Sequence, residues 1–229
     1  MIEGITRQLV VIADLPEYND YSTVNRRVNR LDVKLDLPFG MTIVVGGDGT
    51  GFQAISSGEY MRQKYGKKNR KWIQVIILGD AETKEPVSFE VNIISRSEAD
   101  SVEEQIEDLI DEGVEIKDFF GDGGFDKIAL WKFFEERRIK PIIKPDKNSR
   151  TDSDSSLRNI NVRYRNKFGY EGWAKHTKYG KRWVCTEGIF SAIKRIFGEQ
   201  LAGKSEIGMV QETKMKIWSY VELKRYGEA

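Results

Sequence analysis

Hydrophobic and polar positions follow two different periods along this chain, and the changes between them predict its elements. Short apolar runs bounded by turn residues predict strands, whereas apolar positions that recur every three or four residues predict helices. The predicted strands are residues 42–45, 72–78, 87–94, 114–120 and 140–144. The predicted helices are residues 24–31, 98–113, 127–138, 186–197 and 212–223.

From residue 42 to residue 144 the order is three strands, a helix, a strand, a helix and a strand. A turn at residues 79–86 makes the second and third strands a hairpin. Strands that later alternate with helices are typical of parallel pairing. We therefore predict an α/β fold in which a mixed five-stranded sheet, three antiparallel strands followed by parallel strands, is flanked by helices.

Local patterns add finer expectations. Asp126 directly precedes a predicted helix and is well placed as its N-cap. The last helix should pack Met215, Trp218 and Val221. Residues 148–178 are polar and poorly periodic, so we expect a long functional loop there. Its serine-rich part is the segment most prone to disorder.

Composition limits the class of protein. With 229 residues, 32% charged and 39% hydrophobic, the chain is long enough for one large or two small globular domains. No apolar run approaches the ~18 residues of a membrane span, and no export signal opens the chain. A single cysteine, Cys185, excludes an internal disulfide and a multi-cysteine metal site. We expect a cytoplasmic protein with no membrane contact.

The near-neutral net charge hides a segregation along the chain. Residues 98–126 carry twelve acidic residues and one lysine, and residues 137–195 carry sixteen Lys or Arg and five acidic residues. The acidic stretch falls mostly on a predicted helix and is interpreted as a solvated face. The basic stretch is interleaved with tyrosine, tryptophan and phenylalanine, which is typical of a nucleic-acid surface. Two solvated faces of opposite sign remain the alternative.

Two acidic residues follow predicted strands and stand beside glycines. Asp48 comes after the strand at 42–45, and Asp122 comes after the strand at 114–120. The glycines permit tight turns or a close approach of backbone. If the two strands are neighbours, the carboxylates converge.

A third acidic residue lies on the helix at 186–197, where Glu187 and Lys194 share a face away from the apolar arc. A coincidence on a solvent-exposed face is the simpler alternative. Three carboxylates held together raise one another's pKa unless divalent cations neutralise them. All-oxygen ligation suits Mg²⁺ or Mn²⁺, and two such ions can stabilise both the entering and the leaving oxygen at a phosphorus.

Three motifs in this order resemble the DDE transposases of prokaryotic insertion sequences. They are Asp48-Gly-Thr-Gly-Phe52, Gly121-Asp-Gly-Gly-Phe-Asp126 and the helix from Glu187 to Gly198, within a resemblance that spans about residues 15–226. The family signature is Tyr-x2-Arg-x3-Glu-x6-Lys. The chain has Tyr179, Arg182, Glu187 and Lys194, with one residue more between the arginine and the glutamate.

The resemblance implies a ribonuclease H-like, retroviral-integrase-like catalytic domain. It also implies metal-dependent cleavage of double-stranded DNA at transposon ends and strand transfer into target DNA, without a covalent protein intermediate. The implied catalytic and metal-ligating residues are Asp48, Asp122 and Glu187, and the implied DNA contacts are Tyr179, Arg182, Lys194 and Arg195. Two Mg²⁺ or Mn²⁺ ions, a homodimer assembled on DNA and a nucleoid-associated location complete the expectation.

The resemblance also divides the chain. Family members usually carry a helical DNA-binding region before the first aspartate, and 47 residues precede Asp48 here. We therefore expect a remnant of that region in residues 1–40. The catalytic domain would then be residues 41–229, with a basic insertion at about 148–180. A catalytic-domain product, a truncated relic and half of a split element all fit this division.

Two rival functions stay open. Residues 45–50 also resemble the G-G-D-G-T phosphate loop of NAD and lipid kinases. The chain, however, shows no downstream nucleotide-binding loops of the kind that such kinases carry, and a kinase function does not explain the basic, aromatic stretch. The other rival is a decayed or domesticated transposase that binds DNA without cutting it.

Overall fold

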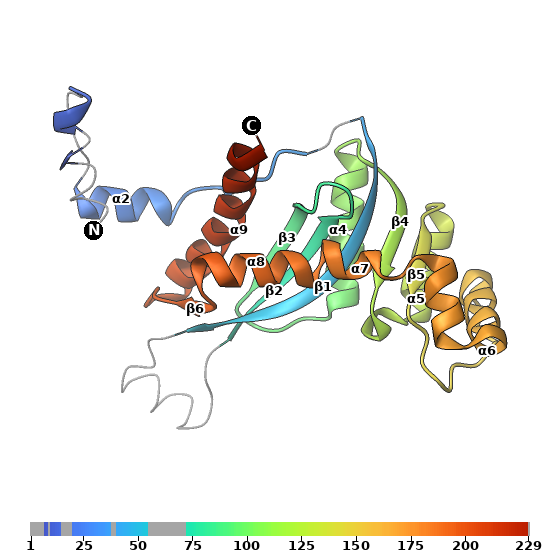
Figure 1. Cartoon of the computed structure of the whole chain (residues 1–229). Coiled ribbons are helices and arrows are strands. Elements are labelled where there is room, and N and C mark those ends of the chain that lie inside the picture. Colours follow the sequence, from blue (N-terminus) through green and yellow to red (C-terminus); the bar gives the residue numbers. More distant parts are fainter. Residues whose placement is uncertain (1–6, 9, 15–19, 38–39, 55–71, 229) are drawn as a thin grey trace, which may run out of the picture.

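A computed structural model gives the structure of residues 7–8, 10–14, 20–37, 40–54 and 72–228. The predicted N-terminal remnant, residues 1–40, is described only in part. Its described helix, α2 (Tyr21–Val28), buries no residue, and in Figure 1 it stands apart from the sheet. Asp20 caps this helix by accepting a hydrogen bond from the Thr23 backbone N–H. The division of the chain at residue 40 stays a prediction.

The core of the fold is a mixed sheet with the strand order β3-β2-β1-β4-β5 (Figure 1). These strands are β1 (Thr42–Ala54), β2 (Trp72–Asp80), β3 (Pro86–Asn92), β4 (Glu115–Gly121) and β5 (Lys140–Ile143). The pairs β1–β2 and β2–β3 are antiparallel, whereas β1–β4 and β4–β5 are parallel. The predicted order is confirmed. A short sixth strand, β6 (Gln200–Leu201), pairs with the end of β1 and was not predicted.

Helices cover both faces of this sheet. They are α4 (Glu98–Asp111), the 3₁₀ turn η1 (Gly123–Phe125), α5 (Ile128–Glu136), α6 (Ser156–Thr177), α7 (Lys181–Cys185), α8 (Glu187–Phe197) and α9 (Glu206–Glu228). In Figure 1, α7 and α8 cross in front of β1 and β2, and α4 lies behind the sheet.

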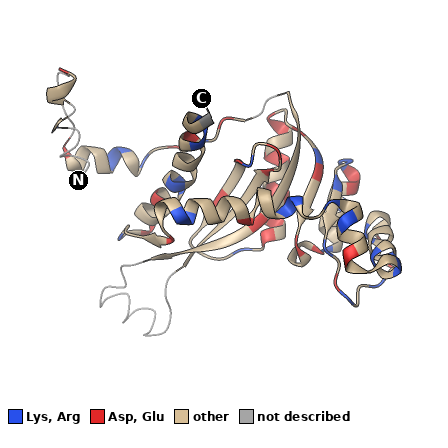
Figure 2. Ribbon diagram, viewed as in Figure 1, with Lys and Arg blue, Asp and Glu red and all other residues tan. Residues whose placement is uncertain are grey.

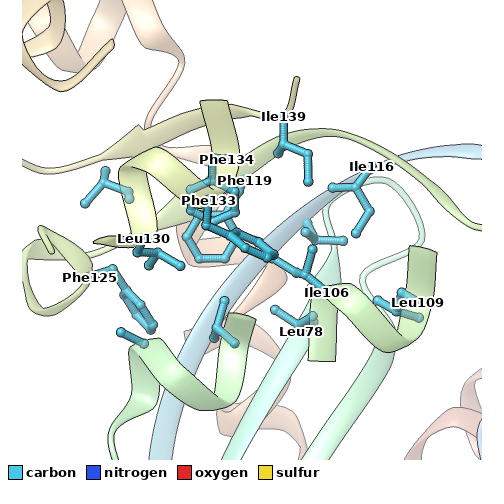
Figure 3. Packing of buried hydrophobic residues seen from close by; sticks show 14 of the residues in the cluster. Leu78, Ile106, Leu109, Ile116, Phe119, Phe125, Leu130, Phe133, Phe134 and Ile139 are labelled. Carbon is cyan, nitrogen blue, oxygen red and sulfur yellow. The ribbon is translucent and has the colours of Figure 1, made fainter. Parts of the chain in front are cut away.

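The face behind the sheet buries the larger apolar cluster, which α4 and α5 close (Figure 3). Phe119 of β4 stacks on Phe134 of α5 with ring centroids 4.7 Å apart. On the front face, Phe52 and Ile77 pack against Ile189 and other apolar residues of α8 and α9. Because β1 alternates between these clusters, the side chain of each of its residues is assigned to one face.

The expectation that the first strand ends at residue 45 is wrong, because β1 continues through the glycine-rich segment to Ala54. These glycines do not form a turn. They allow neighbouring side chains to approach the backbone of β1 closely. A Cβ on Gly46 would collide with Cys185 Sγ, and one on Gly47 would lie 2.9 Å from the Phe119 ring. Asp48 is therefore a mid-strand residue, paired in register with Ile77 of β2.

The expected long loop at 148–178 is also wrong, since most of it forms α6, bent at Gly169 where φ is 72°. The sequence of α6 is polar partly because one of its polar residues belongs to a buried ion pair. Arg158 Nε donates to Asp126 Oδ1 at 2.7 Å, and the two side chains are 10% and 5% exposed. Asp126 does not cap α5, because it is occupied by Arg158 and by Trp131, which donates to it at 2.9 Å.

The last helix begins at Glu206, six residues before the predicted start. Val221 is buried as expected, and Met215 is half-buried. Trp218 is 37% exposed, so its predicted packing is wrong. Within the described residues, we find no helix with the length and apolarity needed to cross a membrane.

Candidate active site

The two aspartates come from neighbouring parallel strands, Asp48 within β1 and Asp122 just after β4. Gly46 of β1 pairs with Phe120 of β4, so Asp48 and Asp122 each lie two residues beyond this pair along the chain. Asp122 follows β4 directly and is the N-cap of η1, where its Oδ1 accepts a hydrogen bond of 2.7 Å from the Gly124 backbone N–H. The negative charge of Asp122 acts on Asp48. The predicted convergence of these two carboxylates is thus supported by the strand pairing.

Asp48 is a largely buried acid with an altered titration. Its side chain is 17% exposed, and Oδ1 accepts a 2.9 Å hydrogen bond from the Gly49 backbone N–H. Burial raises the pKa of Asp48 to about 6. The Gly49 hydrogen bond and the charge of Arg182 oppose that rise, and the charges of Asp122 and Glu98 add to it. A cation beside Asp48 would relieve the cost of burying this charge.

Arg182 connects Asp48 to the third predicted acid. From α7 its Nη2 donates to Glu187 Oε1, and its Nη1 lies 3.9 Å from Asp48 Oδ2. The Arg182 side chain is 15% exposed and that of Glu187 is 43% exposed. The guanidinium therefore bridges the two carboxylates that the resemblance assigns to metal.

The additional residue in the signature coincides with a break between α7 and α8. Thr186 stands between these helices with φ −131° and ψ −84°, and its hydroxyl donates to the Arg182 carbonyl at 2.8 Å. A continuous helix would place Arg182 and Glu187 five residues apart on different faces. The break permits their ion pair.

The other predicted DNA contacts have different environments. Lys194 Nζ donates to Thr50 Oγ1 at 3.0 Å, and Thr50 lies two residues after Asp48 on the same face of β1. Arg195 is exposed and has no hydrogen-bond or ion-pair partner in the described part of the chain. Tyr179 is buried, and its hydroxyl donates to the Gly121 carbonyl at 3.2 Å. Burial raises the pKa of Tyr179. Tyr179 thus supports the residue just before Asp122.

Glu98, the first residue of α4, is a site residue that the sequence reasoning did not identify. Its carboxylate lies against Gly49, so that a Cβ on this glycine would collide with Glu98 Oε1. Burial raises the pKa of Glu98, and the charge of Asp122 raises it further. Acidic residues are common in the first turn of a helix, so the sequence contained no signal that distinguished Glu98 from its neighbours.

The donor chemistry of these residues fits a divalent cation. Carboxylate oxygens are the ligands that Mg²⁺ and Mn²⁺ prefer, and Gly49 leaves room for one of the carboxylates beside β1. Across the residues that the structure describes, however, no three or more His, Cys, Asp or Glu side chains are grouped as a metal site. The Arg182 guanidinium bridges Asp48 and Glu187 instead.

The fold and this arrangement define an α/β domain with carboxylates from two neighbouring parallel strands and from a helix that crosses them. Comparison with known families identifies it further. The model of the family described as "Transposase DDE domain" matches residues 43–221, so the chain belongs to this family and has its ribonuclease H-like fold. No curated protein sequence matches the chain.

Membership of this family settles part of the function. Transposases act on DNA, and DDE transposases generally use divalent metal ions. The kinase alternative loses its basis, because residues 45–50 lie within β1 and form no phosphate-binding loop.

Proposed function

We propose that this protein is a metal-dependent transposase that cleaves DNA at transposon ends and joins the ends to target DNA by in-line attack on phosphodiesters. One observation carries the proposal: Asp48 lies on β1, Asp122 directly follows the adjoining parallel strand β4, and Arg182 links Asp48 to Glu187. The strand pairing and this ion pair support a common site for residues that are distant in sequence.

In this proposal Asp48, Asp122 and Glu187 would hold two Mg²⁺ or Mn²⁺ ions. When bound, such ions supply Lewis-acid stabilisation of the oxygens around the reacting phosphorus. The protein keeps these carboxylates available by different means. The Gly124 backbone N–H orients Asp122, the Gly49 backbone N–H orients Asp48, and Arg182 holds Glu187.

Arg182 changes partners in this proposal. Its charge stabilises the buried Asp48 and the nearby Glu187 in the free protein. With these carboxylates neutralised by bound cations, the guanidinium would be available to a DNA phosphate, for which its planar pair of donors is suited. The predicted DNA contact and the observed ion pairs are then two states of one residue.

Lys194 and Arg195 extend the proposed phosphate contacts along α8. Lys194 reaches Thr50, close to Asp48, and Arg195 is exposed beside it. Figure 2 shows further Lys and Arg residues on α6 and α7. We propose that the basic residues of α6 contribute non-specific, salt-dependent affinity for double-stranded DNA. A homodimer assembled on DNA and a nucleoid-associated, cytoplasmic location belong to the same proposal.

The decisive experiment measures nicking of supercoiled plasmid by the purified chain in Mg²⁺ and in EDTA. We expect Mg²⁺-dependent nicking by the wild type and none above background by Glu187→Gln or Asp48→Asn. Glu171→Gln, which changes an exposed acid of α6, is the matched control and should nick like the wild type. Equal rates for wild type and Glu187→Gln would refute the assignment of the third acid.

DNA binding separates the proposal from its remaining rival. Wild-type protein that binds DNA but never cuts it, in Mg²⁺ or Mn²⁺, is a binding protein derived from a transposase. For the phosphate contacts, Lys194→Met should lower the slope of log affinity against log salt by about 1, as expected for one lost phosphate contact. Short inverted repeats on either side of the gene would give independent support.

A further inference from the structure

Lys216, in the C-terminal helix α9, is a buried lysine whose ammonium group is bound by the protein itself. Its side chain is 10% exposed. Nζ donates to the carbonyl of Gly198 at 3.2 Å and to that of Gln200 at 2.6 Å, and it lies 3.5 Å from Glu212 Oε1. Because a buried ammonium is costly without such partners, these contacts tie α9 to residues 198–200.

Residues 198–200 lead from the end of α8 into β6. The Gly198 backbone N–H donates to the Lys194 carbonyl at 2.9 Å, which closes the last turn of α8. The Glu199 carbonyl accepts a 2.9 Å hydrogen bond from the Gln53 backbone N–H of β1. The segment is therefore fixed by the sheet through its backbone and by α9 through the buried lysine.

The same segment reaches the ammonium of Lys194, the proposed phosphate contact. Lys194 Nζ lies 3.9 Å from Glu199 Oε2 and donates to Thr50 at 3.0 Å. It also lies 5.5 Å from the centroid of the Phe52 ring, and Lys216 Nζ lies 5.7 Å from that centroid. An aromatic face attracts a cation within about 6 Å of its centroid. The two lysines thus share one ring and one backbone segment.

The two ammonium groups differ in how far the protein neutralises them. Lys216 has two carbonyls and the carboxylate of Glu212, whose side chain is only 28% exposed. Lys194 is 27% exposed, and its acidic neighbour Glu199 is 54% exposed, so water screens that pair. The charge of Lys216 is therefore used within the fold, whereas that of Lys194 stays available to a phosphate.

Packing alone does not require a lysine at residue 216. The cluster that α9 buries is apolar and includes Ile217, Tyr220 and Val221 of this helix. An unbranched apolar residue such as methionine would fill similar space, but it would leave two carbonyls of residues 198–200 without their donor. The ammonium therefore serves this segment and not the apolar cluster.

We propose that Lys216 is a positioning residue for Lys194. By binding residues 198–200 and the Phe52 ring from α9, it fixes the neighbours that hold the Lys194 ammonium beside Thr50. The inference rests on the proposed function, in which Lys194 contacts a DNA phosphate. It deepens that function by giving α9 an indirect part in DNA binding.

The first test is a double-mutant cycle on the affinity for a fluorescent DNA duplex, measured by anisotropy at one salt concentration. Lys216→Met should weaken binding about fivefold, a coupling typical of residues in one contact network. In a Lys194→Met background it should cost no further affinity, because the residue that it positions is absent. Equal losses in both backgrounds would overturn the proposal.

Nicking kinetics separate positioning from stability. Lys216→Met should raise the KM for plasmid DNA about fivefold and retain kcat, as expected when a binding contact is misplaced. Lys204→Met is the matched control, since it removes an exposed lysine between β6 and α9 and should leave KM unchanged. If Lys216→Met lowers the melting temperature but not the DNA affinity or KM, Lys216 only stabilises the fold and the proposal is wrong.

Glu199→Gln tests the hold on Lys194 in a variant that should fold normally, because this side chain is exposed. Loss of one negative charge alone should strengthen DNA binding, and this gain should appear in full in a Lys194→Met background. With Lys194 present the gain should be smaller, because its ammonium loses a neighbour that orients it. An equal or larger gain with Lys194 present would contradict the proposed role of residues 198–200.

The Lys194→Met variant distinguishes failure of this inference from failure of the proposed function. If it weakens DNA binding while Lys216→Met matches the wild type, the phosphate contact stands and the role of Lys216 is refuted. If the wild type neither binds nor nicks DNA, or Lys194→Met binds DNA like the wild type, the proposed contact is wrong, and the role of Lys216 is refuted with it.

Discussion

Arg182 and Glu187 form an ion pair across the break between α7 and α8, which Thr186 makes possible by interrupting the helical path. The same guanidinium lies 3.9 Å from Asp48. A positive charge from the protein itself thus occupies the position between two acids assigned to metal. Metal binding and release of Arg182 should therefore be linked.

Removal of Arg182 should affect metal binding and catalysis in opposite directions. Without the guanidinium, Asp48 and Glu187 lose a competing cation, so Arg182→Ala should bind Mn²⁺ about fivefold more tightly, equivalent to ~1 kcal/mol. DNA nicking should fall, because a phosphate contact is lost. Calorimetry with Mn²⁺ and plasmid nicking measure the two effects.

Arg195→Ala provides the control for Arg182. Arg195 is exposed and lies outside the carboxylate cluster, so its loss should reduce DNA affinity and leave Mn²⁺ affinity unchanged. Weaker Mn²⁺ binding by Arg182→Ala would contradict competition and would indicate that Arg182 orders the ligands.

The ion pair between Asp126 and Arg158 should be the electrostatic contact of α6 on which stability depends most. Both side chains are nearly buried, and Asp126 accepts from Arg158 Nε at 2.7 Å and from Nη2 at 2.8 Å. Asp126→Asn leaves a buried guanidinium without its counter-charge, which costs about 3–5 kcal/mol. Thermal or urea unfolding measures this loss. The exposed Asp152→Asn should change stability by less than about 0.5 kcal/mol.

The periodic parts of the chain determined what the sequence could predict. The strand order, the helix at α4 and the helix from Glu187 to Gly198 follow from apolar patterns with clear ends, and the structure confirms them. Gly198, with φ 73°, ends α8 as a glycine should. The neighbourhood of Asp48 and Asp122 follows from the parallel pairing of β1 with β4.

The wrong predictions, at the glycines around Asp48 and at α6, have the same physical origin. Each of these structures depends on contacts between residues that are distant in sequence. From the sequence alone, the glycines around Asp48 indicate a turn. In the structure they lie within a strand packed between α4 and α7, and they are needed because Glu98 and Cys185 approach the backbone closely. The helix α6 is hidden because its buried face includes Arg158, whose counter-charge lies 32 residues earlier. Local periodicity cannot report a polar residue that is buried with a distant partner.

A substitution of Tyr179 can distinguish a role in DNA contact from a role in stability. As a DNA contact, it should influence the affinity for DNA. As placed, its hydroxyl donates to the Gly121 carbonyl and its ring packs on Trp173 with centroids 4.8 Å apart. We expect Tyr179→Phe to cost about 1 kcal/mol of stability by loss of this hydrogen bond, with the salt dependence of DNA binding unchanged. A smaller salt slope at unchanged stability would instead support the DNA contact.

Asp48 should make the stability of the metal-free protein depend on pH in an unusual direction. Its pKa rises from 3.8 in the unfolded chain to about 6 in the folded protein, chiefly because of burial. Between these values the folded state holds more protons, so the free energy of unfolding falls as pH rises through about 4 to 6 and then levels off. Asp48→Asn lacks this titration. In EDTA the free energy of unfolding of Asp48→Asn should be equal to or lower than that of the wild type at pH 4. At pH 7 it should be higher than that of the wild type by up to about 3 kcal/mol.

Denaturant unfolding at several pH values measures this difference, with the exposed Asp152→Asn as the control for loss of one negative charge. Mg²⁺ should then reverse the order at pH 7, because cations that bind the folded wild type stabilise it and have lost a ligand in Asp48→Asn. A stability difference that stays constant from pH 4 to pH 7 would show that Asp48 titrates normally. Its burial would then impose no demand for a cation, and the electrostatic reason for a metal at this position would be lost.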